Sequence, residues 1–297
     1  MKDIVLITGA NGNLAKAVEK LLSNKYEIRK LTTNKQHANG KSIFYWDINS
    51  KYLDKNALIG SKHIIHLCGY SILKRWTKKN KKLMYESRVF GANLLFNKSK
   101  ELNILPETFI SASASGIYQT ESNIEALEED EIGNNWVARM VYEWENAAKR
   151  FRELESRVVN MRISLLISKE SGFLKYTLLS MKYGIGVIIG SKKDIISWIH
   201  INDAARFVKE SLENNIYQGA YNLANEERIT KFDFMKMIKK TISPYSLIIK
   251  MPAFFTRILF GKRRLILDNK IFLSVKKLKR TGFTFEYNSL ENVLRKQ

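Results

Sequence analysis

The sequence contains few of the residues on which small cross-linked proteins depend, and it lacks long hydrophobic runs. Only one of its 297 residues is cysteine and three are proline. Cys68 alone permits no internal disulfide and no cysteine-based zinc site, in keeping with a reducing compartment. No apolar run approaches the roughly 18 residues that span a bilayer, and the N-terminus shows no signal-peptide pattern. We therefore expect a folded cytoplasmic protein with no membrane partner.

Acidic residues are scarce relative to basic ones. The chain has 50 Lys and Arg against 29 Asp and Glu, a formal net charge of +21. Such a charge could serve a nucleic acid or another acidic surface. The basic residues are spread over the whole length, however, and an excess of Lys together with Ile and Asn is typical of AT-rich coding sequence. We expect no specific nucleic-acid site, and keep an acidic-surface binder as one alternative.

The first 160 residues alternate short apolar runs with helical patterns, which is typical of βαβ units and a parallel sheet. Strands are predicted at residues 3–8, 26–31, 42–46, 62–68, 108–112 and 158–163. Helices are predicted at residues 14–23, 77–102 and 134–155, and the acidic residues 121–131 are interpreted as a surface loop. The pattern predicts an α/β fold, a Rossmann doubly wound parallel sheet of six or seven strands.

The pattern changes to shorter elements after residue 163. It predicts a helical segment at 173–183, a strand at 195–199 and a helix at 202–213. We expect a Rossmann domain over residues 1–163, with a further part from about 195–224. Residues 164–194 and 225–297 are expected to form a smaller C-terminal substrate-binding lid.

A glycine motif follows the first predicted strand. Residues 8–15 read TGANGNLA, a G-x-x-G-x-x-[GA] pattern between a strand and a helix. Gly9 would allow the tight turn, Gly12 would let backbone amides approach a diphosphate, and Ala15 would let the helix pack closely. A helix N-terminus favours anions, so the motif predicts dinucleotide binding.

The end of the second strand carries no acidic residue, although an acid there usually binds the ribose 2′-hydroxyl of NAD. Arg29, Lys30 and Lys35 surround this strand end, which suits a 2′-phosphate. The sequence therefore favours NADP(H) over NAD(H). Asp47, at the end of the third strand, could accept a hydrogen bond from the adenine amino group or could simply be a turn residue.

Several segments together resemble a known family. They are TGANGNLA (8–15), KRWTKKNKKLMYESRVFGAN (74–93), FISASASGIY (109–118), YEWENAA (142–148), SWIHINDAAR (197–206), YNLAN (221–225), KMPAFFTRILFG (250–261) and TGFTFEY (281–287). The chain resembles extended short-chain dehydrogenases/reductases, in particular an atypical NAD(P)-dependent epimerase/dehydratase-like subgroup with a small C-terminal region. The resemblance implies an NAD(P)H-binding Rossmann domain and no particular reaction. The cofactor-binding residues then expected are Gly9, Asn11, Gly12, Asn13, Leu14, Thr33, Lys35, Asp47, Leu67, Cys68 and Gly69.

The resemblance also sets expectations for catalysis. Members of this superfamily use a Tyr and a Lys four residues apart on one helix, but residues 134–155 contain no such pair, with Val137 and Val141 at the aligned positions. The resemblance places Ser113 at the position of the catalytic serine and Arg88 at an active-site position. The predicted catalytic residues are Ser113, Arg88 and Tyr142, and the predicted substrate contacts are Arg75, Trp76 and Tyr118. His200 is expected to be structural, and the spacing of His and Cys predicts no metal site.

Two functions remain open beside the acidic-surface binder. The first is an NADP(H)-dependent oxidoreductase or epimerase-like enzyme that transfers hydride to or from a small, sugar-like or anionic substrate, with Ser113 polarising the substrate oxygen. The second is a non-catalytic NADP(H)-binding sensor or regulatory protein, suggested by the missing Tyr and Lys. The chain is expected to be a monomer or a homodimer.

Overall fold

The computed structural model describes residues 2–119, 125–170, 172–263, 266 and 270–295. The chain forms two compact units. Unit 1 comprises Met1–Ala114, Arg139–Arg162 and Ala204–Tyr221, and unit 2 comprises Ser115–Ala138, Ile163–Asp203 and Asn222–Gln297. The assignment of the C-terminal segments to a substrate lid stays a prediction.

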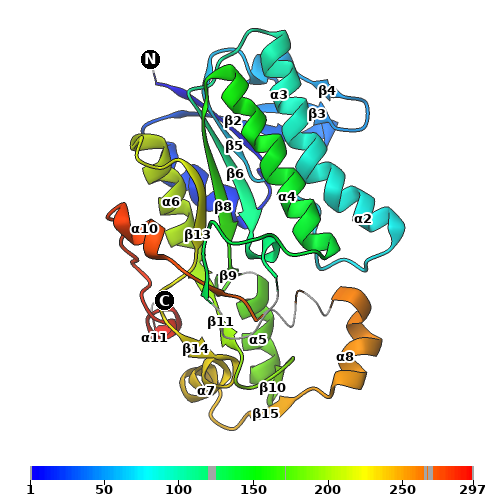
Figure 1. The fold of residues 1–297 in the computed structure, drawn as a ribbon, viewed down its shortest axis with the longest axis vertical. Helices are drawn as coiled ribbons and strands as arrows, with labels where there is room; N and C mark the ends of the chain where they lie inside the picture. The colour runs from blue at the N-terminus through cyan, green and yellow to red at the C-terminus, as the bar shows by residue number, and fades with distance from the viewer. Residues whose placement is uncertain (1, 120–124, 171, 264–265, 267–269, 296–297) are drawn as a thin grey trace. The chain divides into compact units, whose positions relative to one another are not determined.

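An eight-stranded sheet forms the centre of the fold, in the order β13-β8-β6-β5-β1-β2-β3-β4 (Figure 1). Its strands are β1 (Ile4–Thr8), β2 (Glu27–Thr32), β3 (Ile43–Asp47), β4 (Tyr52–Leu53), β5 (Ser61–His66), β6 (Thr108–Ala114), β8 (Arg157–Ile163) and β13 (Gly219–Leu223). β1 runs parallel to β2 and β5, and β5 runs parallel to β6, whereas β4 is antiparallel to β3. The predicted Rossmann-like α/β fold is thus confirmed, and the two edge strands β4 and β13 come in addition to the six strands expected.

The central strands are apolar because both faces of the sheet are covered. Val5 and Leu6 in β1 and Ile64 and Ile65 in β5 are fully buried. Helix α1 (Asn13–Leu22) covers part of this sheet with Val18 and Leu22 turned inward. Strands buried on two faces read as continuous apolar runs, which is why the sequence pattern located them.

The helix predicted at residues 77–102 is divided in three. Helix α2 (Lys78–Tyr85) passes into a π-helical turn (Glu86–Phe90), and α3 (Gly91–Glu101) follows. A Cβ atom at Gly91 would lie 3.1 Å from the ring of His66, so the chain approaches β5 closely here. Single π turns are frequent at functional sites. In the same way the helix predicted at 134–155 is α4 (Trp136–Lys149) followed by a 3₁₀ turn (Arg150–Leu154).

The acidic segment 121–131 is not entirely a loop. Its residues Glu125–Ala126 form strand β7, which pairs with β16 (Phe272–Leu273). The side-chain amide of Asn222 donates to the carbonyl oxygens of Ala126 (2.9 Å) and Ser274 (3.1 Å). The loop prediction failed because a two-residue strand formed with a distant segment has no local pattern. Residues 121–124 of the predicted loop lie outside the described residues.

Unit 2 has a core of its own. It contains β9 (Leu165–Ile167), α5 (Gly172–Lys182), β10 (Ile185–Ile188), β11 (Ile195–Ile196), β12 (Trp198–His200), β14 (Ile229–Thr230), α7 (Lys231–Ile242), β15 (Leu247–Lys250), α8 (Ala253–Phe260), α10 (Lys276–Arg280) and α11 (Leu290–Arg295). Met181, Trp198, Phe234 and Leu290 are fully buried in this core. The strand predicted at 195–199 is in fact two strands, and the predicted helix at 202–213 is α6 (Ile201–Glu213).

The residues around the start of α6, His200 and Asp203, have structural roles. The Asp203 carboxylate accepts hydrogen bonds from the amides of Glu286 (2.9 Å) and Tyr287 (3.1 Å), and the His200 ring stacks on Tyr287 with 3.6 Å between centroids. These contacts anchor the C-terminal segment to unit 2 and agree with a structural role for His200. Among the helices described, none is both long enough and apolar enough to cross a bilayer.

Candidate functional site

The turn between β1 and α1 requires glycine for two reasons. Gly9 has a φ of 70°, and a Cβ atom there would lie 2.7 Å from the carbonyl oxygen of Leu67 at the end of β5. The amide of Gly12 donates to the carbonyl of Gly9 (2.8 Å), which closes the turn. Any larger residue at position 9 would strain the backbone and push β5 away.

The N-terminus of α1 is open. Its N-cap residue is Gly12, which provides no side-chain hydrogen bond, and the first turn contains no acidic residue. The neighbouring Asn11 and Asn13 are exposed. The first backbone amides of a helix have no partner within the helix, so this end offers N–H donors and a positive dipole end to an anion.

A buried polar joint ties the ends of β1 and β5 to the π-helical turn. The Thr8 hydroxyl accepts hydrogen bonds from the amides of Leu67 and Cys68, each at 3.1 Å, and lies 2.9 Å from His66 Nδ1. Nε2 of His66 lies 3.1 Å from the Arg88 carbonyl. A carbonyl only accepts, so the Nε2 nitrogen carries the proton and Thr8 donates to Nδ1. Sequence reasoning missed both Thr8 and His66.

This joint keeps its histidine neutral. Burial lowers the pKa of His66 to about 4, against a weaker opposing effect of the hydrogen bond to Arg88. Burial likewise raises the pKa of the Cys68 thiol to about 11, so Cys68 is a protonated, unreactive thiol at neutral pH. The joint therefore fixes the position of the backbone at residues 66–69 without carrying charge itself.

Arg88 brings a partly buried positive charge to the same place. Its Nη1 atom donates to the carbonyls of Tyr70 (3.0 Å) and Met84 (2.9 Å), and its guanidinium lies 5.2 Å from the centre of the Trp144 ring. Burial lowers its pKa to about 10, which leaves it charged at neutral pH. Within the described part of the chain no carboxylate forms an ion pair with Arg88. Such a partly buried guanidinium is well placed to contact an anion or a developing negative charge.

Arg88 also borders one of the predicted cofactor residues. A Cβ atom at Gly69 would lie 2.9 Å from Arg88 Nη2, so a larger residue there would require the end of the Arg88 side chain to shift. Leu67, Cys68, Gly69 and Arg88 are thus brought together at the carboxyl end of β5. Ligands bind at this end of the strands in open α/β sheets.

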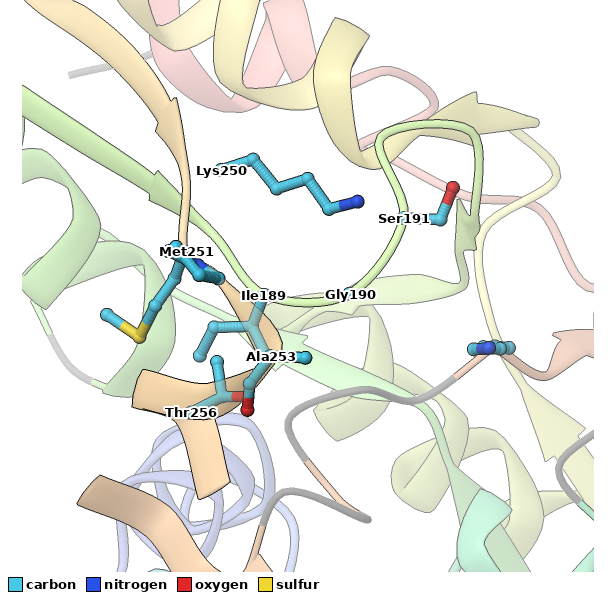
Figure 2. Close-up of a pocket in the computed structure, with 9 residues that line it drawn as sticks. Ile189, Gly190, Ser191, Lys250, Met251, Ala253 and Thr256 are labelled. Atoms are coloured by element: carbon cyan, nitrogen blue, oxygen red, sulfur yellow. The ribbon is translucent and has the colours of Figure 1, made fainter. Parts of the chain in front are cut away.

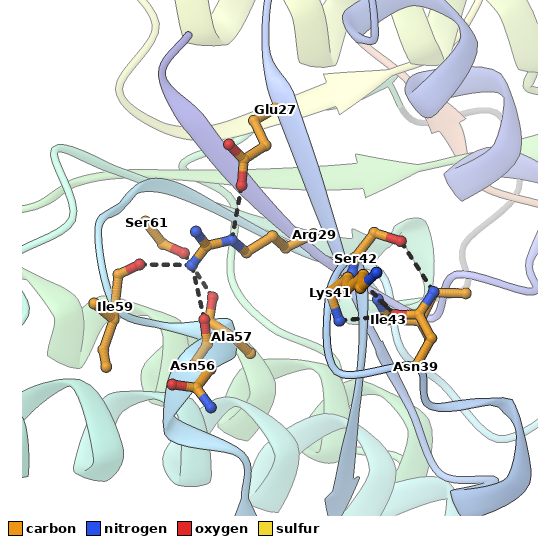
Figure 3. Close-up of polar contacts among 10 residues, drawn as sticks. All are labelled: Glu27, Arg29, Asn39, Lys41, Ser42, Ile43, Asn56, Ala57, Ile59 and Ser61. Carbon is orange, nitrogen blue, oxygen red and sulfur yellow. Dashed lines mark hydrogen bonds and ion pairs between the residues drawn. The ribbon is translucent and has the colours of Figure 1, made fainter. Parts of the chain in front are cut away.

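The basic cluster predicted around the second strand does not form. Arg29 Nη1 donates to the carbonyls of Asn56 (2.7 Å) and Ile59 (2.6 Å), and its Nε pairs with Glu27 at 3.0 Å, as Figure 3 shows. Lys30 pairs with Glu19 of α1 at 2.8 Å. Both side chains are used within unit 1, so their assignment to a 2′-phosphate was wrong. Lys35 is exposed on a 3₁₀ turn (Lys35–His37), and Thr33 is exposed beside it.

The loop before β3 is organised by its own side chains. The Asn39 side chain accepts from the amides of Lys41, Ser42 and Ile43 (Figure 3). Asp47 behaves similarly, because its carboxylate accepts from the Asn49 amide (2.9 Å) and the Ser50 hydroxyl (2.8 Å), and these bonds lower its pKa. The turn interpretation of Asp47 therefore describes its contacts in this structure, and a contact with adenine stays a prediction.

Ser113 belongs to a buried ionic network that sequence reasoning did not foresee. Its hydroxyl donates to Glu145 Oε1 at 2.6 Å. Arg162 holds the same carboxylate with two bonds, Nε to Oε1 at 2.9 Å and Nη2 to Oε2 at 3.0 Å. Ser113, Glu145 and Arg162 are all buried. In this arrangement the only hydroxyl proton of Ser113 is already used, so its oxygen can accept a hydrogen bond but has no proton for a substrate.

The helix α4 presents apolar side chains where a Tyr and a Lys would be needed. Val137 and Val141 are buried, and Glu145 lies one further turn along the same face. Tyr142 is 39% exposed, with the Lys149 ammonium 6.0 Å from the centre of its ring. No contact found in unit 1 joins Tyr142 to Ser113, so its catalytic role stays a prediction.

The predicted substrate contacts belong to both units. Trp76 donates its indole N–H to the carbonyl of Ile72 (3.0 Å), and Arg75 beside it is exposed. Tyr118 belongs to unit 2, is 2% exposed, and donates its hydroxyl to Asn222 at 2.6 Å. A phenol buried in this way contributes to the core of unit 2, so a direct substrate contact by Tyr118 is not what the structure shows.

Unit 2 contains a cavity of about 410 Å³ between the ends of β10 and β15 and the first turn of α8 (Figure 2). Two lysines are among its lining residues, which are Ile189, Gly190, Ser191, Lys250, Met251, Pro252, Ala253, Thr256 and Lys270. The loop at Gly190 is held by a buried ion pair, since Lys231 Nζ lies 3.1 Å from Asp194 and 3.0 Å from the Ile189 carbonyl. Sequence reasoning missed this cavity. No group of three or more His, Cys, Asp or Glu suited to a metal is found among the described residues.

The strand order and the glycine turn define a Rossmann fold of the short-chain dehydrogenase/reductase type. The chain belongs to the NAD dependent epimerase/dehydratase family, whose model matches residues 5–224. It is 30% identical over 295 residues to an epimerase family protein of Staphylococcus haemolyticus, covering 96% of each chain.

Two solved structures support the fold. The chain is similar to the human epimerase family protein SDR39U1, crystallised with NADPH, with a TM-score of 0.86, 22% identity and coverage of 98% of each chain. It is also similar to the dTDP-4-dehydrorhamnose reductase of Bacillus anthracis in complex with NADP, with a TM-score of 0.76, 19% identity and coverage of 99% and 98%. At these identities the likeness establishes the fold and leaves the reaction open.

Proposed function

We propose that this protein binds NADP(H) through the β1–α1 turn and the carboxyl end of β5. The observation that carries the proposal is the turn itself: a Cβ atom at Gly9 would meet Leu67 at 2.7 Å, and α1 begins without a side-chain cap or an acid. The residues present fit a dinucleotide diphosphate, because they offer free amides and leave space next to them. Gly9, Asn11, Gly12, Asn13 and Leu14 would hold the diphosphate.

The remaining contacts follow from the same edge of the sheet. Leu67, Cys68 and Gly69 would border the cofactor at the end of β5, and Thr33 and Lys35 would face its adenosine end. With Arg29 and Lys30 used elsewhere, Lys35 is the predicted residue left to favour a 2′-phosphate. NADP(H) preference therefore rests on one exposed lysine and on the absence of an acid.

A titration of the purified protein with NADPH and NADH, followed by fluorescence, tests this proposal. We expect tighter binding of NADPH and loss of both nucleotides in Gly12→Asp, which places a carboxylate against the diphosphate. The matched control is Asn24→Asp, a new carboxylate in the exposed turn after α1, which should bind as the wild type does. Equal affinity for the two nucleotides would refute the preference, and unchanged binding by Gly12→Asp would refute the site.

We further propose an oxidoreductase or epimerase-like reaction on a small anionic or sugar-like substrate. A bound nicotinamide cofactor would supply the carbon that gives or takes a hydride. The partly buried Arg88 guanidinium would stabilise negative charge that develops on a substrate oxygen. Ser113 can turn its proton toward a substrate only by releasing Glu145, and the two bonds from Arg162 keep that carboxylate satisfied when it does.

Unit 2 has a cavity of its own that suits a small acidic molecule. Lys250 and Lys270 line it, and both are cations that would favour a phosphate or a carboxylate. Figure 2 shows Lys250 extending from β15 above the Gly190 loop. We propose a small acidic molecule as the substrate, no specific nucleic acid, and a monomeric or homodimeric protein.

Turnover separates this enzyme from the alternative, a cofactor-binding sensor. The sensor is favoured by the buried valines of α4 and by the engaged proton of Ser113. We expect NADPH oxidation on aldehydes, ketones or nucleotide sugars to be slower by about 10² to 10⁴ than with a Tyr/Lys pair. Ser113→Ala and Arg88→Ala should abolish it, and Tyr142→Phe tests the predicted proton donor. NADPH binding with no turnover on any substrate would favour the sensor.

A further inference from the structure

The two-stranded sheet β10–β15 has one face in the core of unit 2 and one face outside it. The strands are parallel, with Ile185 opposite Leu247. Alternate residues point to opposite faces, and Ile188 and Ile248 pack into the core of unit 2. The other face is also apolar, and we call it the β10–β15 face. It consists of Ile185, Val187, Leu247 and Ile249 together with Tyr183 and Tyr245, which precede the two strands.

The side chains of this face are exposed to an unusual degree. Tyr183 is 81% exposed, Tyr245 72% and Leu247 66%. The apolar surface continues on α5, where Tyr176 and Leu179 are also exposed and lie on the same helical stripe as Tyr183. The Tyr183 amide bonds to the Leu179 carbonyl, and the Tyr245 hydroxyl lies 3.3 Å from the Lys182 carbonyl, so α5 and the face are continuous. Contiguous exposed apolar surface marks an interaction site.

The next element along the chain has the same character. Helix α8 follows β15 directly, and Phe254, Phe255, Ile258 and Leu259 are each more than half exposed. Residues 172–188 and 245–263, which contain α5, the face and α8, carry six basic residues and no Asp or Glu. These basic residues are Lys175, Lys182, Lys250, Arg257, Lys262 and Arg263.

The charge decides between possible partners. A second copy of this chain would bring two positively charged surfaces together, which is unfavourable. An anionic partner has the complementary sign. The combination of exposed Tyr and Phe rings, aliphatic side chains and surrounding lysines is that of proteins that lie in the interface of an anionic bilayer. Tyrosine in particular has an apolar ring and a polar tip that suit the level of the lipid headgroups.

We propose that the β10–β15 face docks on the surface of an anionic lipid bilayer, with Lys175 and Lys182 of α5 near the headgroups. Such a protein lies on the membrane and does not span it. From the sequence we tested only the length of apolar runs, and that criterion detects helices that span a membrane. It cannot detect an apolar face formed by alternate residues of two short strands. This proposal is an alternative to the expectation of no membrane partner, and the experiment below decides between them.

Flotation with lipid vesicles tests the proposal on the full chain. We expect binding to vesicles of 70% phosphatidylcholine and 30% phosphatidylglycerol, at about 0.1 M salt, and at least fivefold weaker binding to phosphatidylcholine alone. Tyr183→Ser combined with Leu247→Ser should lower the partition coefficient at least tenfold. The matched control is Leu105→Ser combined with Ile216→Ser, two residues of unit 1 with exposures of 57% and 53%. It should bind as the wild type does.

A second pair of double variants tests whether the position of the lysines matters, because both variants change the net charge by the same amount. Lys175→Glu with Lys182→Glu should reduce binding at least tenfold, whereas Lys78→Glu with Lys79→Glu on α2 should have less than a twofold effect. Circular dichroism and NADPH binding should be unchanged in all variants, which separates this proposal from the proposed cofactor site.

Three results would overturn the proposal. The first is absence of binding to anionic vesicles by the wild type. The second is vesicle binding that is lost in the lysine variant but unchanged in the Tyr183 and Leu247 variant. This result would indicate that the basic residues serve a soluble acidic partner. The third is a dimer in light scattering that dissociates in the Tyr183 and Leu247 variant, which would assign the face to a second copy.

Discussion

The two halves of the candidate site in unit 1 lie at the ends of neighbouring strands and are built in different ways. At the ends of β1 and β5 the site is formed by the backbone, because Gly9, Gly12 and Gly69 have no side chains and leave space next to backbone amides. At the end of β6 it is formed by side chains, because Ser113 and Arg162 meet on the buried carboxylate of Glu145. The first half offers free donors to a ligand, whereas the hydrogen bonds of the second are already made.

This difference shows which part of the family's machinery the chain retains. A glycine turn acts through its backbone alone. Finding the glycines in the sequence is therefore nearly sufficient to predict the turn in the structure. A catalytic side chain depends on partners from other elements, and here Glu145 competes with a substrate for the Ser113 proton. Under the proposed function, the first half would bind the cofactor as the family's turn does, whereas the second half would have to release Ser113 from Glu145 before it could act on a substrate.

The largest expected change in stability comes from breaking the buried network of Ser113, Glu145 and Arg162. Glu145→Ala should destabilise the protein by about 3–5 kcal/mol, because it leaves the Arg162 charge buried without a partner. The measurement is the free energy of unfolding from denaturant titration. Glu101→Ala is the control, since its pair with Lys98 is exposed and should contribute less than about 1 kcal/mol. A loss below about 1 kcal/mol in Glu145→Ala would show that the network is not held as described.

The double change Glu145→Leu with Arg162→Leu sharpens this test. Replacing both partners of a buried ion pair by apolar residues is often neutral or stabilising. We expect the double variant to recover most of the stability that Glu145→Ala loses. If it is as unstable as the single variant, the stability of this region depends on something other than compensation of charge.

The next effect concerns the polar joint of the first half. The folded-state pKa of His66 is about 4, below its ordinary value of 6.5, so the unfolded chain binds the proton first as the pH falls. Stability is full above about pH 6.5 and should decrease toward pH 4 by up to about 3 kcal/mol. Unfolding measured across this range should show a steeper slope for the wild type than for His66→Asn. Replacement of the exposed His37 by Asn is the control, and identical slopes for wild type and His66→Asn would refute a neutral buried His66.

The smallest effect concerns the preference for NADP(H). Lys35→Glu should reduce the ratio of NADPH to NADH affinity by about tenfold, because it replaces the remaining positive charge by a negative one. Lys55→Glu, an equally exposed change on another 3₁₀ turn, should leave the ratio unchanged. Fluorescence titration of both nucleotides gives the ratio. If Lys35→Glu keeps the wild-type ratio, the preference arises elsewhere or does not exist.

Sequence reasoning located most of unit 1 and misjudged where segments meet. The buried strands and the helix after Gly12 were predicted closely, because burial on both faces gives continuous apolar runs. The predicted helix over 77–102 was interrupted by a π turn, which follows from the close approach of Gly91 to His66. The predicted basic cluster lost Arg29 and Lys30, because neighbours in sequence on a strand point to opposite faces and find different partners, and Lys35 on the following turn remains exposed.

By itself, the sequence determined the Rossmann-like sheet, the glycine turn and the absence of a Tyr/Lys pair, since each depends on local pattern or on residue identity. Only the tertiary structure decided that Ser113 and Arg162 meet on the Glu145 carboxylate, that Arg88 is partly buried with no acidic partner among the described residues, and that no described segment covers the β10–β15 face. Glu145 and Arg162 are 17 residues apart, and β10 and β15 are joined only after about 60 residues of intervening chain. Contacts between such distant segments are set by packing of the whole chain, and no local pattern records them.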